Sequence, residues 1–215
     1  MSAARQVAWI SGGTVASPHR PVNMRAEKEG GLPVSSWFRR QEERNPAPRL
    51  YLEIVEQARR TEFYETLGVP DTLDGRFEMI VLHMFLIVRR LRGLGENGAK
   101  IGQALFDAMF ADMDRNLREM GVGDLGVGRR VKKMAERFYG SVQAYDRGLE
   151  ADADEELQAA LGRNVFAASE PPQANVAALA AYLRREAGAL DAKPEGDLLA
   201  DPIGFGEPPN LGSSP

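Results

Sequence analysis

The chain has 215 residues, of which 43% are hydrophobic, and its formal net charge is −4; this is enough apolar material for one domain with a substantial core. The absence of cysteine excludes disulfide bonds and thiolate metal sites, and the acidic total without a nucleic-acid-binding motif argues against specific DNA binding. The longest apolar run, Met79–Val88, spans about 15 Å as a helix, against about 30 Å of bilayer hydrocarbon, so it predicts a buried helix and not a membrane span.

The two ends of the chain differ in composition from its middle. Residues 1–48 are rich in Gly, Pro and charge and predict a disordered N-terminal tail, in which Met1 and Met24 are both candidate starts. Residues 194–215 combine Pro, Gly and acidic residues and predict a disordered acidic C-terminal tail. We therefore expect a single folded domain over residues 49–193.

Helical patterns begin at the start of this domain. The first covers Leu50–Leu67, where Gly68 ends it and Pro70 prevents its return. The second runs over Leu73–Leu94, with Asp71 or Thr72 as the N-cap. Because its middle is apolar nearly all round, we expect this second helix at the centre of a bundle.

Four further helical patterns follow. They are expected over Lys100–Met120, Gly128–Glu150, Asp154–Phe166 and Ala174–Leu190, with the glycine-rich GVGDLGVG as a flexible connector after the first of them. The strongest amphipathic signal lies in 128–150, where Met134, Phe138 and Tyr145 belong to one apolar stripe. Without strict two-residue alternation anywhere, the predicted fold is all-α: a single bundle of about six helices with disordered tails.

Several segments together resemble the ubiquinol–cytochrome c chaperone family, in its alphaproteobacterial form. These are LGVPDTLDGRFEMIVLHMFLIVRRL, DMDRNLREMGVGDLGVGRRVKKM, FYG, AYD and ALGRNVF, within about residues 50–190. The resemblance implies an assembly factor for the cytochrome bc1 complex that receives newly made cytochrome b, together with a small accessory assembly protein as a further partner. It also implies no enzymatic activity, and it includes His83 and Arg89 in a pattern of the family.

The only histidine in the helical region gives no catalytic or metal site. His83 interrupts an apolar run, and its single companion in the chain is His19 in the predicted tail. We therefore interpret His83 as a buried structural residue, with Arg89 as a second structural polar residue. Asp107, Asp112 and Asp114 lack the Glu-x-x-His repeats of di-metal bundles and are expected to form ion pairs. No catalytic residue, metal or cofactor is predicted.

The helix over 128–150 carries the predicted partner-binding residues. Its basic residues are opposed only by Glu136, and they are either a solvated face or a contact for an anionic membrane, a ribosome or an acidic partner. The predicted set is Arg129, Arg130, Lys132, Lys133, Arg137, Tyr139 and Tyr145. Gly140 is expected in helix–helix packing. A methionine-rich surface between the second and third helices is the alternative client-binding region.

The functional hypothesis is a non-catalytic assembly chaperone for the cytochrome bc1 complex that binds cytochrome b. The resemblance places it on the cytoplasmic face of a bacterial inner membrane or, alternatively, on the matrix side in mitochondria. From the residues alone, two other functions stay open. One is a ribosome- or membrane-associated helical scaffold that handles no client, and the other is an enzyme centred on His83, which would need a polar pocket around that side chain.

Overall fold

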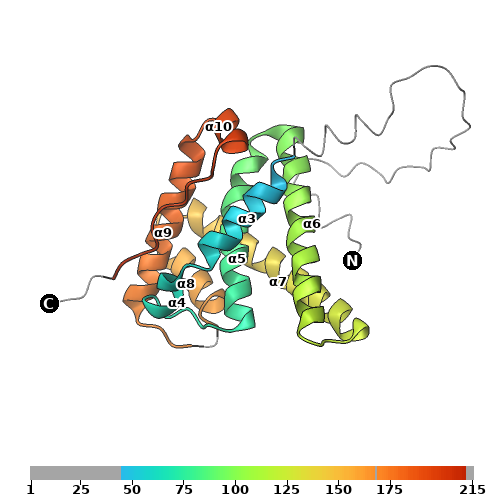
Figure 1. Ribbon diagram of the computed structural model, residues 1–215. Helices are drawn as coiled ribbons and strands as arrows, with labels where there is room; N and C mark the ends of the chain where they lie inside the picture. The colour runs from blue at the N-terminus through green and yellow to red at the C-terminus, as the bar shows by residue number, and fades with distance from the viewer. Residues whose placement is uncertain (1–44, 168, 212–215) are drawn as a thin grey trace, which may run out of the picture.

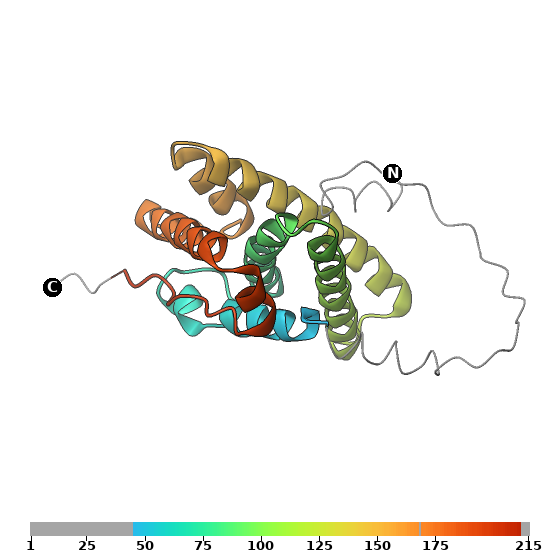
Figure 2. The same cartoon turned by 90° about the horizontal axis from the view of Figure 1, so that it is seen from above.

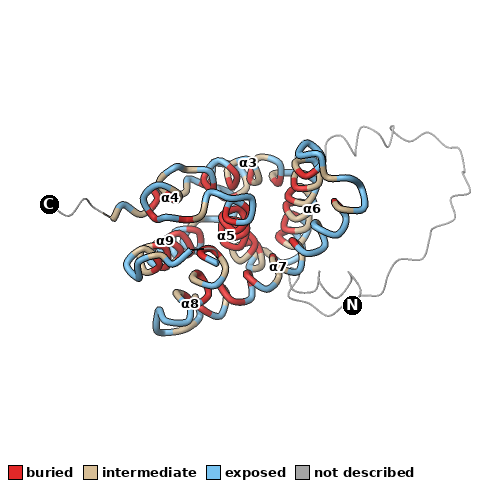
Figure 3. The backbone as a smooth tube through the Cα atoms, turned by 90° about the horizontal axis from the view of Figure 1, so that it is seen from below, coloured by how far each residue is buried: buried red, intermediate tan, exposed pale blue. Residues whose placement is uncertain are grey.

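A long buried helix runs through the middle of the molecule. The computed structural model describes residues 45–167 and 169–211, and all regular structure in them is α-helical, which confirms the predicted fold class. The central helix is α5 (Leu73–Arg92), which the other helices surround (Figures 1 and 3). The Thr72 hydroxyl caps it by accepting a 3.1 Å hydrogen bond from the Gly75 amide. Every residue from Phe77 to Val88 is buried, as the apolar run predicts.

The remaining helices pack around α5 in a simple order. The helices that pack most extensively against α5 are α3 (Ala47–Ala58), α6 (Gly95–Glu119), α7 (Asp124–Glu150) and α9 (Gln173–Ala192). The shorter α8 (Glu155–Asn164) packs against both α7 and α9. The turn between α6 and α7 lies at the edge of the molecule farthest from α9 (Figures 1 and 2). In the described ranges, no helix combines the length and apolar character needed to cross a bilayer.

The predicted first helix, Leu50–Leu67, is divided in two. After α3 ends, Arg60 is extended, with φ −56° and ψ 129°, and a short α4 (Thr61–Glu65) follows. The change of direction places Phe63 in the core, where it is fully buried against the rings of His83 and Tyr182. Helical periodicity cannot reveal such a break, because neither Gly nor Pro marks it.

The glycine-rich connector between the third and fourth predicted helices is shorter than expected. Gly121 has φ +80° and follows the end of α6, as predicted. However, α7 begins at Asp124 with Gly123 as its N-cap, so the second half of GVGDLGVG is helical. The prediction that this helix starts at Gly128 is therefore wrong by a full turn.

The end of the chain packs onto the domain, in contrast to the loose tail predicted from residue 194. Residues Glu195–Ala200 form α10, and residues 201–211, here called the C-terminal strap, run back along α9 (Figure 1). Leu198 and Ile203 are buried, and the Arg49 guanidinium donates to the carbonyl oxygens of Leu198, Leu199 and Asp201. These apolar residues are too few and too widely spaced to produce a periodic pattern. The predicted N-terminal tail lies outside the described residues apart from 45–48.

Candidate functional site

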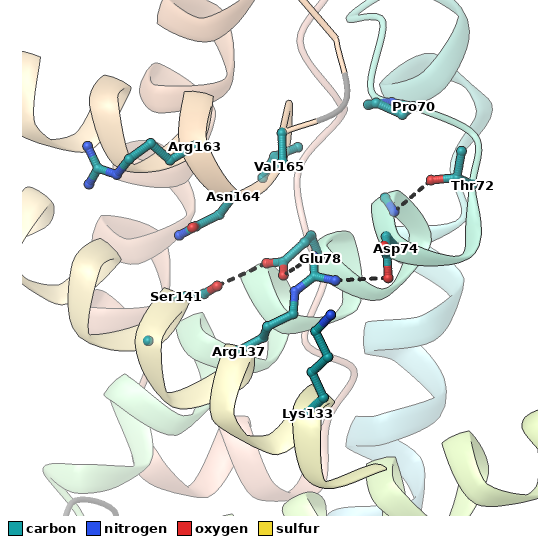
Figure 4. A pocket seen from close by; sticks show the side chains of 13 residues that line it. Pro70, Thr72, Asp74, Glu78, Lys133, Arg137, Ser141, Arg163, Asn164 and Val165 are labelled. Carbon is teal, nitrogen blue, oxygen red and sulfur yellow. Dashed lines mark hydrogen bonds and ion pairs between the residues drawn. The ribbon is translucent and has the colours of Figure 1, made fainter. Parts of the chain in front are cut away.

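A cavity of about 530 Å³ opens between α5, α7 and α8 (Figure 4). Three segments that are far apart in the sequence line it, and their lining residues lie within 70–78, 133–141 and 163–167. These segments coincide with LGVPDTLDGRFE, RRVKKMAERFYGSV and ALGRNVF. The fold therefore brings the distinctive stretches of the sequence to one place, which makes this cavity the candidate functional site.

A buried carboxyl group forms one wall of the cavity. Glu78 is only 1% exposed; its Oε2 accepts a 3.1 Å hydrogen bond from the Ser141 hydroxyl, and its Oε1 lies 2.9 Å from Arg137 Nη2. Burial raises the pKa of Glu78 to about 7, although Arg137 and Ser141 act in the opposite direction. Arg137 Nη1 is also 2.8 Å from Asp74 Oδ1, so one guanidinium bridges two carboxylates (Figure 4).

The predicted basic cluster divides between two environments. Arg137 lies in the cavity wall, and the exposed Lys133 also lines the cavity. Arg129, Arg130 and Lys132 are exposed near the start of α7, away from the lining. A further basic residue, the exposed Arg163 of α8, also lines the cavity. The sequence alone could not separate these roles, because the division depends on where α8 lies.

The two predicted tyrosines also differ. Tyr139 is half-buried, with its ring centroid 5.7 Å from that of Phe106 and 5.5 Å from that of Phe138. Tyr145 is fully buried, and its ring lies 5.8 Å from that of Phe85. The prediction that Tyr145 contacts a partner is wrong, because the same apolar stripe that predicts α7 turns this residue into the core.

Glycine positions on α7 show where the helix makes its close contact. A Cβ added to Gly148 would lie 2.7 Å from Leu157 Cα, so Gly148 allows α7 and α8 to meet. A Cβ added to Gly140 would have no atom within 4 Å, and Gly140 lines the cavity. The expected packing role of Gly140 therefore belongs to Gly148, and the missing side chain at Gly140 leaves the cavity open.

His83 lies in a closed polar core and not in the cavity. Its side chain is fully buried; Nδ1 is 2.8 Å from the Met79 carbonyl oxygen and Nε2 is 2.9 Å from the Tyr182 hydroxyl. Because a carbonyl oxygen only accepts, Nδ1 carries the proton and Nε2 accepts from Tyr182. Gln57 Nε2 in turn donates to the Tyr182 oxygen over 2.9 Å. The His83 side chain is therefore closed to solvent, in contrast to the open polar pocket that a catalytic His83 would need.

Arg89 connects three helices at the opposite end of α5. Its Nη1 lies 2.8 Å from Asp191 Oδ2 on α9, and its Nε lies 3.9 Å from Asp146 Oδ1 on α7. Arg92 binds the same Asp146 at 2.9 Å. The Arg89 side chain is 29% exposed, so it is a partly exposed ion-pair residue and not a buried one.

The methionines and the aspartates of α6 that the sequence analysis considered lie outside the cavity. Most methionines are core residues, namely Met79, Met84, Met109, Met113 and Met134, so they form no groove between α5 and α6. Asp112 and Asp114 pair with Arg115 and Arg118, at 2.7 and 2.6 Å. In residues 45–167 and 169–211 no group of three or more His, Cys, Asp or Glu could hold a metal ion.

Sequence reasoning missed Glu78, Ser141 and Asn164 as cavity residues. One feature of the sequence does point to Glu78, which directly precedes the apolar run of α5. Because this part of the helix is buried on every face, a carboxyl group there needs a partner. No such signal marks Ser141 or Asn164, because small polar residues are common on solvated helix faces.

The buried Glu78 and His83 give opposite contributions to the pH dependence of stability. Burial lowers the pKa of His83 from 6.5 to about 4, so the unfolded chain binds more protons in this range and stability falls as the pH drops through it. The pKa of Glu78 is raised from 4.5 to about 7, so the folded chain binds more protons and stability falls as the pH rises through that range.

Replacing Glu78 by Gln should remove its contribution to the pH dependence of stability and leave that of His83. We expect the free energy of unfolding of Glu78→Gln, relative to wild type, to increase as the pH rises from 4.5 to 7, by up to about 3 kcal/mol. Urea unfolding at a series of pH values measures this difference. A difference that is the same at every pH would contradict the assignment of a raised pKa to Glu78.

Comparison with known proteins relates these features to a family. The family model described as ubiquinol-cytochrome C chaperone matches residues 65–205. The ubiquinol-cytochrome-c reductase complex assembly factor 1 of Xenopus laevis is 29% identical over 153 residues, covering 71% of this chain and 76% of the frog protein. The human protein of that name is also 29% identical over 153 residues, which span 71% of this chain but only 51% of its own length.

A solved structure shares the fold. The crystal structure of the Cbp3 homolog from Brucella abortus has a TM-score of 0.71 and 37% sequence identity, and the match covers 81% of this chain and 97% of that one. The protein CBP3, mitochondrial, of Saccharomyces cerevisiae is 33% identical over 107 residues, which are 48% of this chain and 32% of the yeast protein.

Proposed function

The chain belongs to the ubiquinol–cytochrome c chaperone family, and on this basis we propose that it is an assembly chaperone for the cytochrome bc1 complex. In this proposal it binds newly made cytochrome b and catalyses no reaction. The relatives from frog and human are named as assembly factors of the ubiquinol-cytochrome c reductase complex. The observation that carries the proposal is the convergence of the three family-like segments on one cavity.

The lining of the cavity favours a polar segment of the client. Glu78 and Asp74 supply acidic groups, Lys133 and Arg163 supply cations, and Arg137 joins the two carboxylates. Placing a purely apolar transmembrane segment against the exposed Asp74, Lys133 and Arg163 would cost the hydration of each charge without returning a hydrogen bond. We propose that a charged or polar loop or chain end of cytochrome b enters the cavity, whose volume fits only a short segment.

Gly140 offers a way to fill the cavity without damaging the helix. We expect Gly140→Leu to keep or raise the melting temperature, because a leucine is favoured over glycine inside a helix by up to about 1 kcal/mol. The added side chain should occupy the cavity, where a Cβ meets no atom within 4 Å. Capture of cytochrome b by affinity purification from membranes, and the level of assembled bc1 complex, should both fall strongly.

Gly188→Leu is the matched control. Gly188 is also exposed inside a long helix, α9, and a Cβ there meets no atom within 4 Å, but Gly188 is not part of the cavity lining. This variant should capture cytochrome b as the wild type does. If Gly140→Leu is folded and captures cytochrome b equally well, the client does not enter the cavity.

We further propose that the protein works as a peripheral protein on the cytoplasmic face of a bacterial inner membrane, or on the matrix side in a mitochondrion. The exposed Arg129, Arg130 and Lys132, with Lys133, support contact with an anionic membrane or a ribosome. A small accessory assembly protein is a further proposed partner.

The competing function, a scaffold that handles no client, predicts normal bc1 levels in the Gly140→Leu variant.

A further inference from the structure

Two exposed apolar side chains lie on either side of the α6–α7 turn. Leu125 is 86% exposed and Met120 is 59% exposed, and they are the two most exposed large hydrophobic residues in the described part of the chain. Exposed apolar patches on a protein frequently mark a surface that binds something. We call residues 120–125 the α6–α7 tip; it lies at the edge of the molecule away from α9 (Figures 1 and 2).

Basic residues continue from the tip along the exposed face of α7. Arg129 and Lys132 follow Leu125 by four and seven residues, so the three side chains share one helix face. Arg130 and Lys133 are exposed beside them. From residue 125 to residue 135 the chain has these four basic residues and no acidic one.

Two acidic residues near the tip share one basic partner. Asp124 and Asp114 both pair with Arg118, which balances one of their two negative charges. Glu119 and Glu136 are the acidic residues that border the region. Gly121 and Gly123 add no side chain between Met120 and Leu125, and open space surrounds both glycines, so the tip is narrow.

We propose that the α6–α7 tip inserts Met120 and Leu125 into the interface of an anionic lipid bilayer, with the four basic residues of α7 on the headgroups. The proposal rests on the peripheral membrane location given above. Apolar side chains that enter the acyl boundary beside Lys and Arg are the usual means by which peripheral segments bind anionic membranes. A ribosome would use the basic residues alone, because phosphate binding is electrostatic and gives Leu125 and Met120 no role.

The test compares the full chain with variants on two kinds of vesicle, phosphatidylcholine alone and phosphatidylcholine mixed with phosphatidylglycerol. The wild type should bind only the mixed vesicles. Leu125→Ser combined with Met120→Ser should weaken that binding by about tenfold or more, and neutralising the four basic residues to Gln should weaken it by about fivefold for each charge. Leu52→Ser is the control, because Leu52 is a 58% exposed leucine on α3.

The absence of cysteine gives a direct measure of insertion. Leu125→Cys introduces a single thiol for an environment-sensitive fluorophore, and its emission should shift to the blue on mixed vesicles, whereas the same label at Leu52→Cys should not respond. The proposal is overturned if the serine variant binds mixed vesicles like wild type, if the label at 125 stays in water, or if the wild type binds ribosomes but no vesicle.

Membrane insertion by the α6–α7 tip and client binding in the cavity can be tested independently. A tip variant that no longer binds vesicles but still captures detergent-solubilised cytochrome b supports insertion and leaves the chaperone function standing. Conversely, vesicle binding that persists in Gly140→Leu, while client capture is lost, shows that the two surfaces act independently and supports both proposals.

Discussion

A chain that ends at residue 193 is expected to unfold at a temperature about 10–30 °C lower than the full chain, because it loses about 4–8 kcal/mol of stability. Leu198 and Ile203 are buried and account for most of this loss, at about 1.5–3 kcal/mol each. The rest comes from polar groups left without partners. The carbonyl of Gly206 accepts from Gln57 and its amide donates to Glu186, and both of those side chains are buried.

Thermal unfolding followed by circular dichroism measures this effect, with a chain ending at residue 211 as the control. The control keeps α10 and the whole C-terminal strap, so it should melt like the full chain. Since domains of this size are stable by only about 5–15 kcal/mol, the shorter chain should be partly unfolded at growth temperature. Equal melting temperatures for the two truncated chains would show that the C-terminal packing contributes little.

The second large effect is expected for His83→Ala, at about 3–5 kcal/mol of stability. The variant leaves a cavity where the rings of Phe63 and Phe205 now contact the imidazole, with centroid distances of 5.5 and 5.2 Å. It also removes the hydrogen-bond acceptor of the buried Tyr182 hydroxyl and the donor to the Met79 carbonyl. Urea unfolding at neutral pH gives the free energy of unfolding for comparison with wild type.

Tyr182→Phe separates the hydrogen bond from the packing. This change keeps the ring but removes the hydroxyl that His83 and Gln57 share. In the double variant with His83→Ala the two losses should not add, because the residues contact each other directly. If His83→Ala melts like wild type but abolishes bc1 assembly, His83 acts in function and not in stability.

The parts of the fold that the sequence predicts are those that depend on long amphipathic or uniformly apolar runs. The long apolar stretch of α5 predicts its central position, and the stripe of Met134 and Phe138 predicts α7. The break at Arg60 and the start of α7 at Asp124 depend on tertiary packing and on a local N-cap, which periodicity does not register.

The candidate site was less accessible to sequence reasoning for a related physical reason. The basic residues of α7 are adjacent in sequence and form a recognisable group, whereas the cavity combines three segments whose proximity is a property of the fold. Arg137 illustrates the limit: by spacing it belongs with Lys133, but its guanidinium turns inward because Glu78 is buried opposite it. A charge pattern identifies which residues are polar and not which of them face water.

The packing of α10 and the C-terminal strap against α3 constrains how the protein is made. Ile203 donates its amide to Glu53, which lies 150 residues earlier, and Arg49 reaches carbonyl groups at a similar separation. At 5–20 residues per second, a ribosome needs about 10–30 s to produce that length of chain. During this interval α3 can dock on α5 and α6 while Arg49, Glu53 and Gln57 still lack their later partners. The chaperone thus completes its own folding only after most of it has been translated, and cannot reach full stability as a nascent chain.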